Sequence, residues 1–208
     1  MKLRRWVKAA LLSSAAMLTF VLLGGISKTS THSGPAFAGT FKSNQGQLPS
    51  AIRFVTRGDG YDLFLTEREA VLTLSPASGR QRVLRMSLEG SRAPEAIEGL
   101  DPSGSAFGAV QFRGVYRGVD LVLAEGRLKP DFVLTAGATA ADIRIRFDGM
   151  EQMAVDSTGA LTLHMGPKMV SIPPPVVYQE TGNQRLHLRY AYRILEGNRV
   201  GLRLGSTD

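Results

Sequence analysis

Apolar and polar residues alternate along most of the chain after residue 40, and this period of two is the feature that most restricts the fold. Successive side chains of a β-strand point to opposite faces of a sheet, so each alternating run predicts a strand with one buried and one solvated face. An amphipathic helix would instead repeat every 3.6 residues. The clearest runs are 84–88, 143–147, 161–165, 186–194 and 200–204.

Turn-forming residues separate these runs. They are the segments 58–60, 78–79, 101–104, 156–159 and 196–198, which are rich in Gly, Asp, Asn and Ser. Such residues supply the backbone conformations of tight hairpins. The spacing predicts about twelve short strands, and hence an all-β domain built as an antiparallel sandwich or a barrel-like sheet.

Three segments interrupt the alternation. Thr66–Ala70 and Thr139–Ala141 each predict a capped single turn or a very short helix. Pro173–Pro175 predicts a stiff extended link, because proline lacks the amide proton that a central strand needs.

The first 38 residues have a different character. Met1–Lys8 is basic, Ala9–Ile26 is apolar, and the tripeptide Ala36–Ala38 ends the segment with small residues at the required spacing. These are the three parts of a secretory signal peptide. We expect cleavage between Ala38 and Gly39, which would release a single domain of residues 39–208.

The same apolar run is also long enough to cross a bilayer. The alternative is therefore an N-terminal apolar helix that stays uncleaved as a signal anchor, with its basic end in the cytoplasm. Residues 9–26 would then be the chain's contact with the membrane. In both cases we expect an exported domain that is periplasmic, displayed on the cell surface or secreted.

Charge and cysteine content exclude several function classes. The net charge is +7, but five of the 25 basic residues and none of the 18 acidic residues precede residue 39. The remainder is nearly balanced, which does not favour nucleic-acid binding. The chain contains no cysteine, so disulfides, thiol catalysis and cysteine-based zinc sites are excluded. With 43% hydrophobic residues, a core alone can hold such a domain.

An ordered set of short segments covers most of the region 41–205. The segments are Asn44–Leu48, Arg53–Phe54, Gly58–Tyr61, Leu63–Thr66, Val83–Met86, Tyr116–Val122, Asp131–Val133, Ala136–Ala138, Ile143–Arg144 and Pro175–Glu180. Together they resemble the N-terminal domain of unknown function that precedes SBBP repeats, the seven-bladed β-propeller repeats of secreted bacterial proteins. The resemblance implies an extracellular or cell-surface all-β module of a bacterial protein, and it implies no known chemistry.

Three departures from that family stand out. The stretch 99–110 is shorter than expected, Lys129–Pro130 replaces a sheet-compatible pair, and no propeller repeats occur in the sequence. The chain is therefore either a stand-alone or a truncated member. A function that belongs to the propeller cannot be carried over to it.

Five aspartates are candidates for a carboxylate pair of a glycosidase or for a calcium site: Asp59, Asp62, Asp101, Asp120 and Asp131. Asp120 and Asp131 lie within strand-like runs, where a charge needs a partner, and we expect an arginine such as Arg113, Arg117 or Arg127. We predict structural ion pairs, with Asp120, Asp131 and Arg117 as the residues to consider for a ligand.

Other candidate groups have simple structural interpretations. His164 and His187 lie on the polar phase of their strands, which predicts solvated residues in place of a zinc site. Arg57–Asp59 spells the integrin-binding tripeptide, but these residue types also suit a turn. Five tyrosines and a row of strand arginines, among them Arg189 and Arg193, could contact glycans.

These observations predict a non-enzymatic, exported β-module that contacts an envelope or extracellular protein through strand edges or loops. A β-propeller protein is one partner that the resemblance suggests, and we expect no cofactor and no resident metal. The first alternative is a carbohydrate-binding module for a polysaccharide. A glycosidase-like hydrolase is a minor alternative, because it needs two carboxylates at one cleft.

Overall fold

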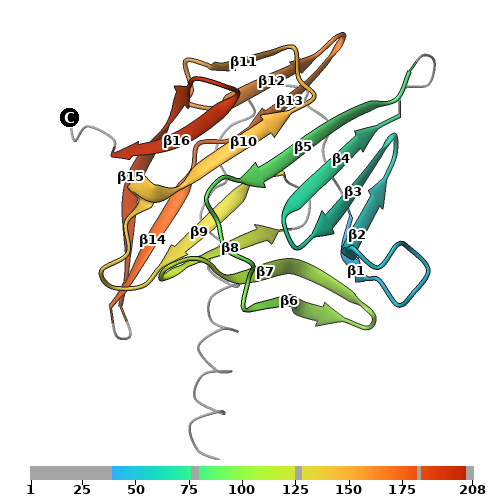
Figure 1. Cartoon of the computed structure of the whole chain (residues 1–208), viewed down its shortest axis with the longest axis horizontal. Helices are drawn as coiled ribbons and strands as arrows, with labels where there is room; N and C mark the ends of the chain where they lie inside the picture. The colour runs from blue at the N-terminus through green and yellow to red at the C-terminus, as the bar shows by residue number, and fades with distance from the viewer. Residues whose placement is uncertain (1–38, 76–79, 125–127, 182–183, 205–208) are drawn as a thin grey trace, which may run out of the picture. The chain divides into compact units, whose positions relative to one another are not determined.

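The computed structural model describes residues 39–75, 80–124, 128–181 and 184–204 (Figure 1). The predicted N-terminal helix, Ala38 on the amino-terminal side of the expected cleavage site, the turn at 78–79 and Arg127 lie outside these residues. Within them, one 3-10 helix spans Ala140–Asp142. Their sixteen β-strands are β1 (Phe41–Ser43), β2 (Ile52–Gly58), β3 (Tyr61–Thr66), β4 (Glu69–Leu74), β5 (Arg82–Leu88), β6 (Ala96–Ser103), β7 (Ala106–Tyr116), β8 (Val119–Ala124), β9 (Pro130–Leu134), β10 (Arg144–Asp148), β11 (Gln152–Val155), β12 (Leu161–Met165), β13 (Lys168–Ile172), β14 (Val176–Thr181), β15 (Gln184–Leu195) and β16 (Arg199–Leu204).

Thirteen strands form one large sheet in the order β1-β2-β3-β4-β5-β10-β16-β15-β14-β9-β8-β7-β6. The sheet also closes on itself, because β1 pairs with β7 through Phe41 opposite Phe107 and Lys42 opposite Ala106. The strands consequently follow one another around a ring, which can be traced in Figure 1. β6 pairs with β7 from Ala106 to Arg113 and lies outside this ring as an additional edge strand. The all-β prediction is confirmed.

The predicted number of about twelve strands is too low, and the sheet is not wholly antiparallel. β9 and β14 run parallel, with Val177 opposite Phe132. A parallel pair needs a long connection, and the segment from β10 to β13 provides it. The additional strands escape an alternation search because they are short, as in β1, or have no regular burial, as in β11.

The inward positions of the closed sheet supply the core. β3 buries Tyr61, Leu63 and Leu65 at every second position, and β8 and β9 repeat the pattern with Val119, Leu121 and Leu123 and with Pro130, Phe132 and Leu134. The alternating runs predicted at 84–88, 143–147, 161–165, 186–194 and 200–204 coincide with β5, β10, β12, β15 and β16.

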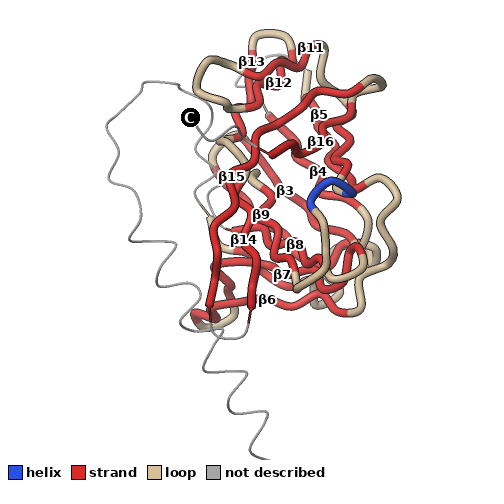
Figure 2. Tube along the Cα trace, turned by 90° about the vertical axis from the view of Figure 1, so that its left-hand side faces the viewer, coloured by secondary structure: helices blue, strands red, loops and turns tan. Residues whose placement is uncertain are grey.

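A second sheet of three strands, in the order β11-β12-β13, lies at one end of the ring near β5 and β16 (Figures 1 and 2). Its residues Leu161, Leu163 and Met165 belong to the same core cluster as the large sheet. The central strand β12 is covered on both faces, since Thr162 on its polar phase is buried too and donates a hydrogen bond to the carbonyl of Ala154.

The three segments that interrupt the alternating pattern have the structures that the sequence predicts. Thr66 caps the β3–β4 turn by accepting hydrogen bonds from the amides of Arg68 and Glu69 at 3.2 and 3.0 Å. Thr139 caps the 3-10 helix in the same way. Pro173–Pro175 links β13 to β14 outside both strands. No helix in the described parts of the chain has the length and apolar character needed to span a bilayer.

Candidate interaction surfaces

Asp120 has a structural role in a strand irregularity. Its Oδ1 accepts a hydrogen bond from the amide of Gly114 at 2.7 Å, and its Oδ2 accepts one from Nε2 of Gln111 at 2.9 Å. The pairing of β7 with β8 shifts register between Phe112 and Tyr116, and Gly114 has a φ of 65° there. The carboxylate thus satisfies an amide that the strand ladder leaves out. The expected arginine partner is replaced by these two donors.

Arg117 and Arg113 lie elsewhere. Arg117 is exposed in the turn between β7 and β8. Arg113 reaches Glu98 on β6, with 4.0 Å between the charged atoms. Neither side chain forms a described contact with Asp120 or Asp131, so the predicted set Asp120, Asp131 and Arg117 does not come together as one site.

Asp131 instead pairs with a lysine. The Nζ of Lys129 lies 3.1 Å from its Oδ1, and the two side chains are only 7% and 19% exposed. An isolated charge at this depth would be costly, whereas the pair neutralises itself. Tyr192 on β15 is also buried, and its hydroxyl donates a hydrogen bond to the carbonyl of Pro173 at 3.0 Å. Burial, and secondly the negative charge of Asp131, raise the pKa of Tyr192 above its usual range.

The remaining aspartates are separate from one another. Asp59 is exposed in the β2–β3 turn, and Asp62 on β3 pairs with Arg57 at 3.5 Å. Asp101 adopts a φ of 49° in β6. In the described contacts, no two of these carboxylates lie close together. A glycosidase would require such a pair at one cleft.

The Arg57–Asp59 tripeptide has a structural explanation. A Cβ added at Gly58 would lie 2.0 Å from the ring of Tyr61, so only glycine fits beneath that ring. Arg57 is occupied by Asp62. The three residues are therefore explained by the hairpin that contains them.

The two histidines occupy different sheets. His164 lies half-buried on β12, and His187 is exposed on β15, where its ring packs against Tyr178 with 5.4 Å between centroids. Across the residues that the structure describes, no group of three His, Cys, Asp or Glu side chains is placed to hold a metal ion.

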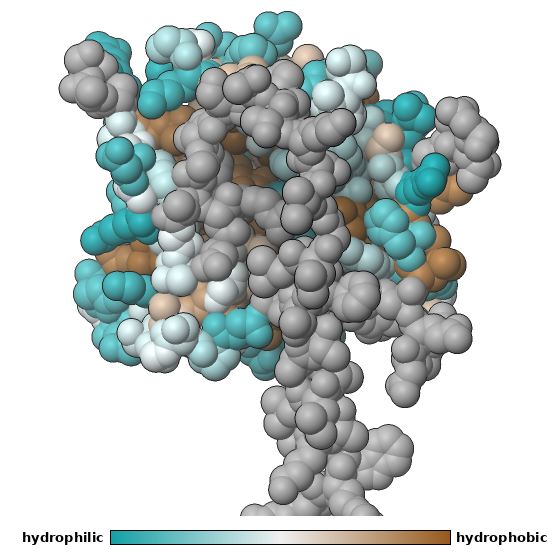
Figure 3. Space-filling model, turned by 180° about the vertical axis from the view of Figure 1, so that it is seen from behind, coloured by the Kyte–Doolittle hydropathy of each residue, from teal (hydrophilic) through white to brown (hydrophobic). Residues whose placement is uncertain are grey.

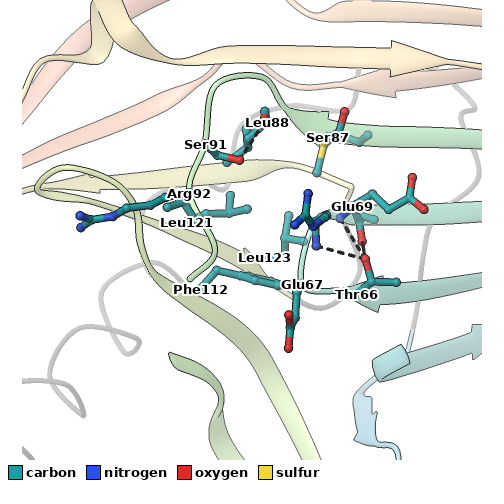
Figure 4. A pocket seen from close by; sticks show the side chains of 14 residues that line it. Thr66, Glu67, Glu69, Ser87, Leu88, Ser91, Arg92, Phe112, Leu121 and Leu123 are labelled. Carbon is teal, nitrogen blue, oxygen red and sulfur yellow. Dashed lines mark hydrogen bonds between the residues drawn. The ribbon is translucent and has the colours of Figure 1, made fainter. Parts of the chain in front are cut away.

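A small recess opens beside the β3–β4 turn (Figure 4). Its floor consists of apolar side chains, including Met86, Phe112, Leu121 and Leu123, and its rim includes Glu69, Ser91 and Arg92. The recess holds about 30 Å³, which is room for roughly two water molecules. It is too small for a sugar ring or a nucleotide.

A wider, open depression of about 570 Å³ adjoins the recess. It is lined by Ser50, Ala51, Thr66–Glu69 and Ser87, none of them aromatic. The two glutamates at its rim lie near basic side chains, Glu67 near Arg53 and Glu69 near Arg85. It therefore offers neither a stacking surface nor an unpaired carboxylate pair.

The most exposed large apolar side chains lie on β15 and β16. Leu204 is 68% exposed and Leu186 is 60% exposed. Leu186, Leu188 and Tyr190 share one face of β15, and Leu204 on β16 lies directly opposite Tyr190. We call these four residues the β15 row. Leu188 and Tyr190 are partly buried, so the exposed members of the row are Leu186 and Leu204.

The register explains this exposure. The described pairing of β15 with β16 ends at Tyr190, whereas its pairing with β14 continues from Arg189 to Gln184. From Leu186 to Arg189, the β15 edge away from β14 therefore has no strand partner within the described residues. Figure 2 looks onto this long hairpin, and Figure 3 shows apolar areas among hydrophilic ones on the side opposite to Figure 1.

Comparison with known families gives one match. The profile of a domain of unknown function, DUF7948, matches residues 41–208. The chain belongs to the DUF7948 family. The matched region starts at the first residue of β1, and nothing in the match links the family to SBBP repeats. No curated protein and no solved structure matches the chain.

Proposed function

We propose that this DUF7948 chain is an exported, non-enzymatic module that binds another protein along the part of the β15 edge that has no described strand partner. The partner is an extended segment whose apolar residues alternate with polar ones. Its backbone would pair with β15 from Leu186 to Arg189, and its apolar side chains would cover the β15 row. The basic and apolar N-terminal segment supports export from the cytoplasm.

The observation that carries this proposal is a strand edge that has no partner among residues 39–75, 80–124, 128–181 and 184–204, together with exposed leucines on the adjoining face. An open edge presents unpaired N–H and C=O groups, which an additional strand satisfies. The side-chain row then supplies apolar contacts at alternate positions. Closed sheets ordinarily remove such edges, so an edge without a partner in the described part of the chain, beside two exposed leucines, favours a binding role.

The setting of the partner is extracellular or within the cell envelope. A β-propeller protein is one candidate, as the sequence resemblance suggests. The two candidate aspartates have structural contacts that support this proposal: Asp120 accepts from strand donors, and Asp131 pairs with Lys129.

A second candidate function has one observation in its favour. Tyr178 and His187 form an aromatic pair on the opposite face of the same hairpin, with the exposed Arg189 nearby on β15. Aromatic rings and arginines together can contact an anionic glycan. This supports polysaccharide binding as the alternative, although the depression at the β3–β4 turn adds no aromatic side chain to it.

The experiment compares variants of the full chain, purified after export and immobilised. The double variant L186E/L204E places two charges on the β15 row, and Val83→Glu serves as the matched control. Val83 is an exposed apolar residue at 36% on β5, away from the row. Each immobilised chain is exposed to an envelope extract of the source cells, and circular dichroism verifies that all fold alike.

We expect the unchanged chain and the Val83→Glu chain to retain the same discrete protein at moderate salt. Retention by L186E/L204E should fall by at least about tenfold, because loss of one buried leucine contact alone is worth more than the corresponding free energy. Equal retention by all three chains, or retention of polysaccharide alone, would overturn the proposal.

A further inference from the structure

One face of the sheet carries arginines on three neighbouring strands. β10, β16 and β15 lie side by side (Figure 1), and their residues Ile145, Val200 and Tyr192 are buried in the core. The residues that alternate with these three therefore point to the outward face of the sheet. Six of them are arginines, which we call the arginine face: Arg144 and Arg146 on β10, Arg199 and Arg203 on β16, and Arg189 and Arg193 on β15.

The positive charge of this face is only partly compensated. Nε of Arg146 lies 2.9 Å from Oδ2 of Asp148, and Nη1 of Arg199 lies 3.3 Å from Oε2 of Glu89. The contacts of the described residues give no carboxylate to the other four members: Arg144, Arg189, Arg193 and Arg203.

The other strand arginines with described side chains lie on β2, β5 and β7, and each of them contacts a carboxylate. In the described strands, the arginines without such a contact are thus gathered on one face. A solvated surface with scattered charges would not require this segregation.

Arg144 and Arg193 lie on either side of a glycine. Gly201 on β16 pairs with Arg144 of β10 at one edge and with Arg193 of β15 at the other. A Cβ added to Gly201 would lie 3.6 Å from Nη1 of Arg144, so this guanidinium group extends toward the glycine. The same nitrogen donates hydrogen bonds to the carbonyls of Ala141 and Ile143. Neutral oxygens therefore fix the position of the Arg144 charge and leave it uncompensated.

An aromatic pair continues the arginine face onto β14. Tyr178 on β14 lies opposite His187 on β15, and their ring centroids are 5.4 Å apart. His187 and Arg189 point to the same side of β15, because they are two residues apart in an extended strand. Flat rings thus lie beside guanidinium groups on one continuous surface.

We propose that the arginine face and the Tyr178–His187 pair bind an anionic polysaccharide, whose sugars carry carboxylate or sulfate groups. Guanidinium groups form paired, charge-assisted hydrogen bonds with such groups. Arg189 and Arg193 are roughly 13 Å apart along β15, and Arg144 and Arg193 are roughly 10 Å apart across β16. These separations are too large for one small anion, whereas a polymer with repeated charges can contact several arginines at once.

The aromatic pair selects a sugar chain over a membrane surface. Tyrosine and histidine rings offer flat apolar area beside a polar tip, which suits the faces and hydroxyls of sugars. Lipid phosphates need only the positive charges. The combination of rings and arginines on the same face therefore favours the polysaccharide.

This site is separate from the surface of the proposed function. Leu186, Leu188 and Tyr190 of the β15 row occupy the alternate positions of β15 and so point to the opposite side from Arg189 and Arg193. The polysaccharide is thus a second ligand beside the protein partner. Its binding does not depend on the β15 row, and the chain could hold that partner at a polysaccharide surface.

The test measures the affinity of the full chain, purified after export, for polygalacturonate, for dextran sulfate and for uncharged dextran. The variant R193Q/R203Q removes two charges from the arginine face. R53Q/R113Q is the matched control, because it removes two charges from arginines on β2 and β7 that are 51% and 55% exposed. Circular dichroism verifies that the variants fold alike.

We expect at least one of the two charged polymers to bind, more weakly at high salt, and dextran not to bind. R193Q/R203Q should weaken binding by at least about tenfold, because charge-assisted hydrogen bonds are lost. R53Q/R113Q should change it by less than about twofold, as screening limits the effect of distant charges. Equal losses in the two double variants would overturn the inference, since net charge alone would then explain binding.

The assignment to a sugar chain is tested by His187→Ala, which removes an exposed ring and should weaken polymer binding several-fold. An unchanged affinity would overturn that assignment. Tighter binding to phosphatidylglycerol vesicles than to either polymer would overturn it too and assign the face to a membrane, and failure to bind both charged polymers would overturn the whole inference.

One further variant separates this inference from the proposed function. An L186S/L204S chain should bind the charged polymer as well as the unchanged chain does, because both leucines lie on the opposite face. Loss of polymer binding in this variant would contradict a separate site. Loss of the protein partner alone would leave the polysaccharide site standing.

Discussion

The ammonium nitrogen of Lys129 lies 3.1 Å from Oδ1 of Asp131, two residues along the chain at the start of β9. Residues at i and i+2 of an extended strand project to the same side, so the pair is formed within one short segment. Both side chains are largely withdrawn from water. The pair is consequently a point where the fold is sensitive to loss of one charge.

Asp131→Asn should lower the free energy of unfolding by about 3 kcal/mol, because it leaves the Lys129 charge buried without its partner. Urea unfolding measures the change. Replacing both residues by apolar ones, as K129M/D131L, should be milder than the single change. Asp62→Asn, in the exposed pair with Arg57, is the control and should cost less than about 1 kcal/mol. Equal costs for the two single variants would show that the buried pair has no special role.

Asp120→Ala should destabilise the chain by about 2 kcal/mol, since it removes the acceptor of the Gly114 amide and of the Gln111 side chain. Chemical denaturation gives the difference. Asp59→Ala changes an exposed aspartate in a turn and should stay within about 0.5 kcal/mol of the unchanged chain. If Asp120 served a ligand only, its replacement would leave stability unaltered.

Alanine substitutions at Gly149 and Gly46 would distinguish the cost of a strained backbone conformation from the cost of a steric clash. Both have φ near 100°, at 99° and 101°. A Cβ at Gly149 would lie 2.0 Å from the carbonyl oxygen of Val83, whereas nothing lies within 4 Å of one at Gly46. Gly149→Ala should therefore cost about 1 to 3 kcal/mol more than Gly46→Ala. Thermal melting of both variants checks this, and similar melting temperatures would contradict the close packing of β5 on residue 149.

The buried phenol of Tyr192 should make the free energy of unfolding decrease at alkaline pH. Its pKa is raised in the folded state by burial and by Asp131. An unfolded tyrosine ionises at pH of about 10, so the folded chain is favoured fully below that pH and loses this contribution as pH rises above it. The loss from this group approaches about 1.4 kcal/mol per pH unit.

Tyr192→Phe removes this contribution. At neutral pH the variant should be less stable by about 1 kcal/mol, because the hydrogen bond to Pro173 is lost. Above pH 10 the difference from the unchanged chain should shrink, as followed by urea unfolding at pH 7, 10 and 11. Parallel pH profiles would mean that Tyr192 ionises as readily in the folded chain as in the unfolded one.

The alternating pattern predicts individual strands well but says little about their partners. It locates β5, β10, β12, β15 and β16 because each has one buried and one solvated face. The closure of β1 on β7 rests on two residue pairs between segments far apart in sequence. The parallel pairing of β9 with β14 likewise follows from the path of the whole chain, which no local pattern contains.

For the candidate surfaces, too, the sequence predicts the strands but not which of their residues are exposed or paired. The sequence marks Leu186 and Leu204 as apolar-phase residues and so predicts burial, yet both are exposed because the described β16 ends opposite Tyr190. The sequence marks Lys129 only as part of a Lys–Pro pair that does not suit a sheet, and it does not predict the contact of Lys129 with Asp131. The signal that could have revealed it is the i, i+2 spacing of opposite charges in an extended segment.

The most direct test of the account is photo-crosslinking from the β15 row in the source cells. A photo-reactive amino acid is placed at position 186 of the full chain, and at position 83 as the control. The account predicts a discrete crosslinked product with one extracellular or envelope protein from position 186 and none from position 83. The same products from both positions, or no protein product from position 186, would contradict the claim that this edge of the sheet binds a protein partner.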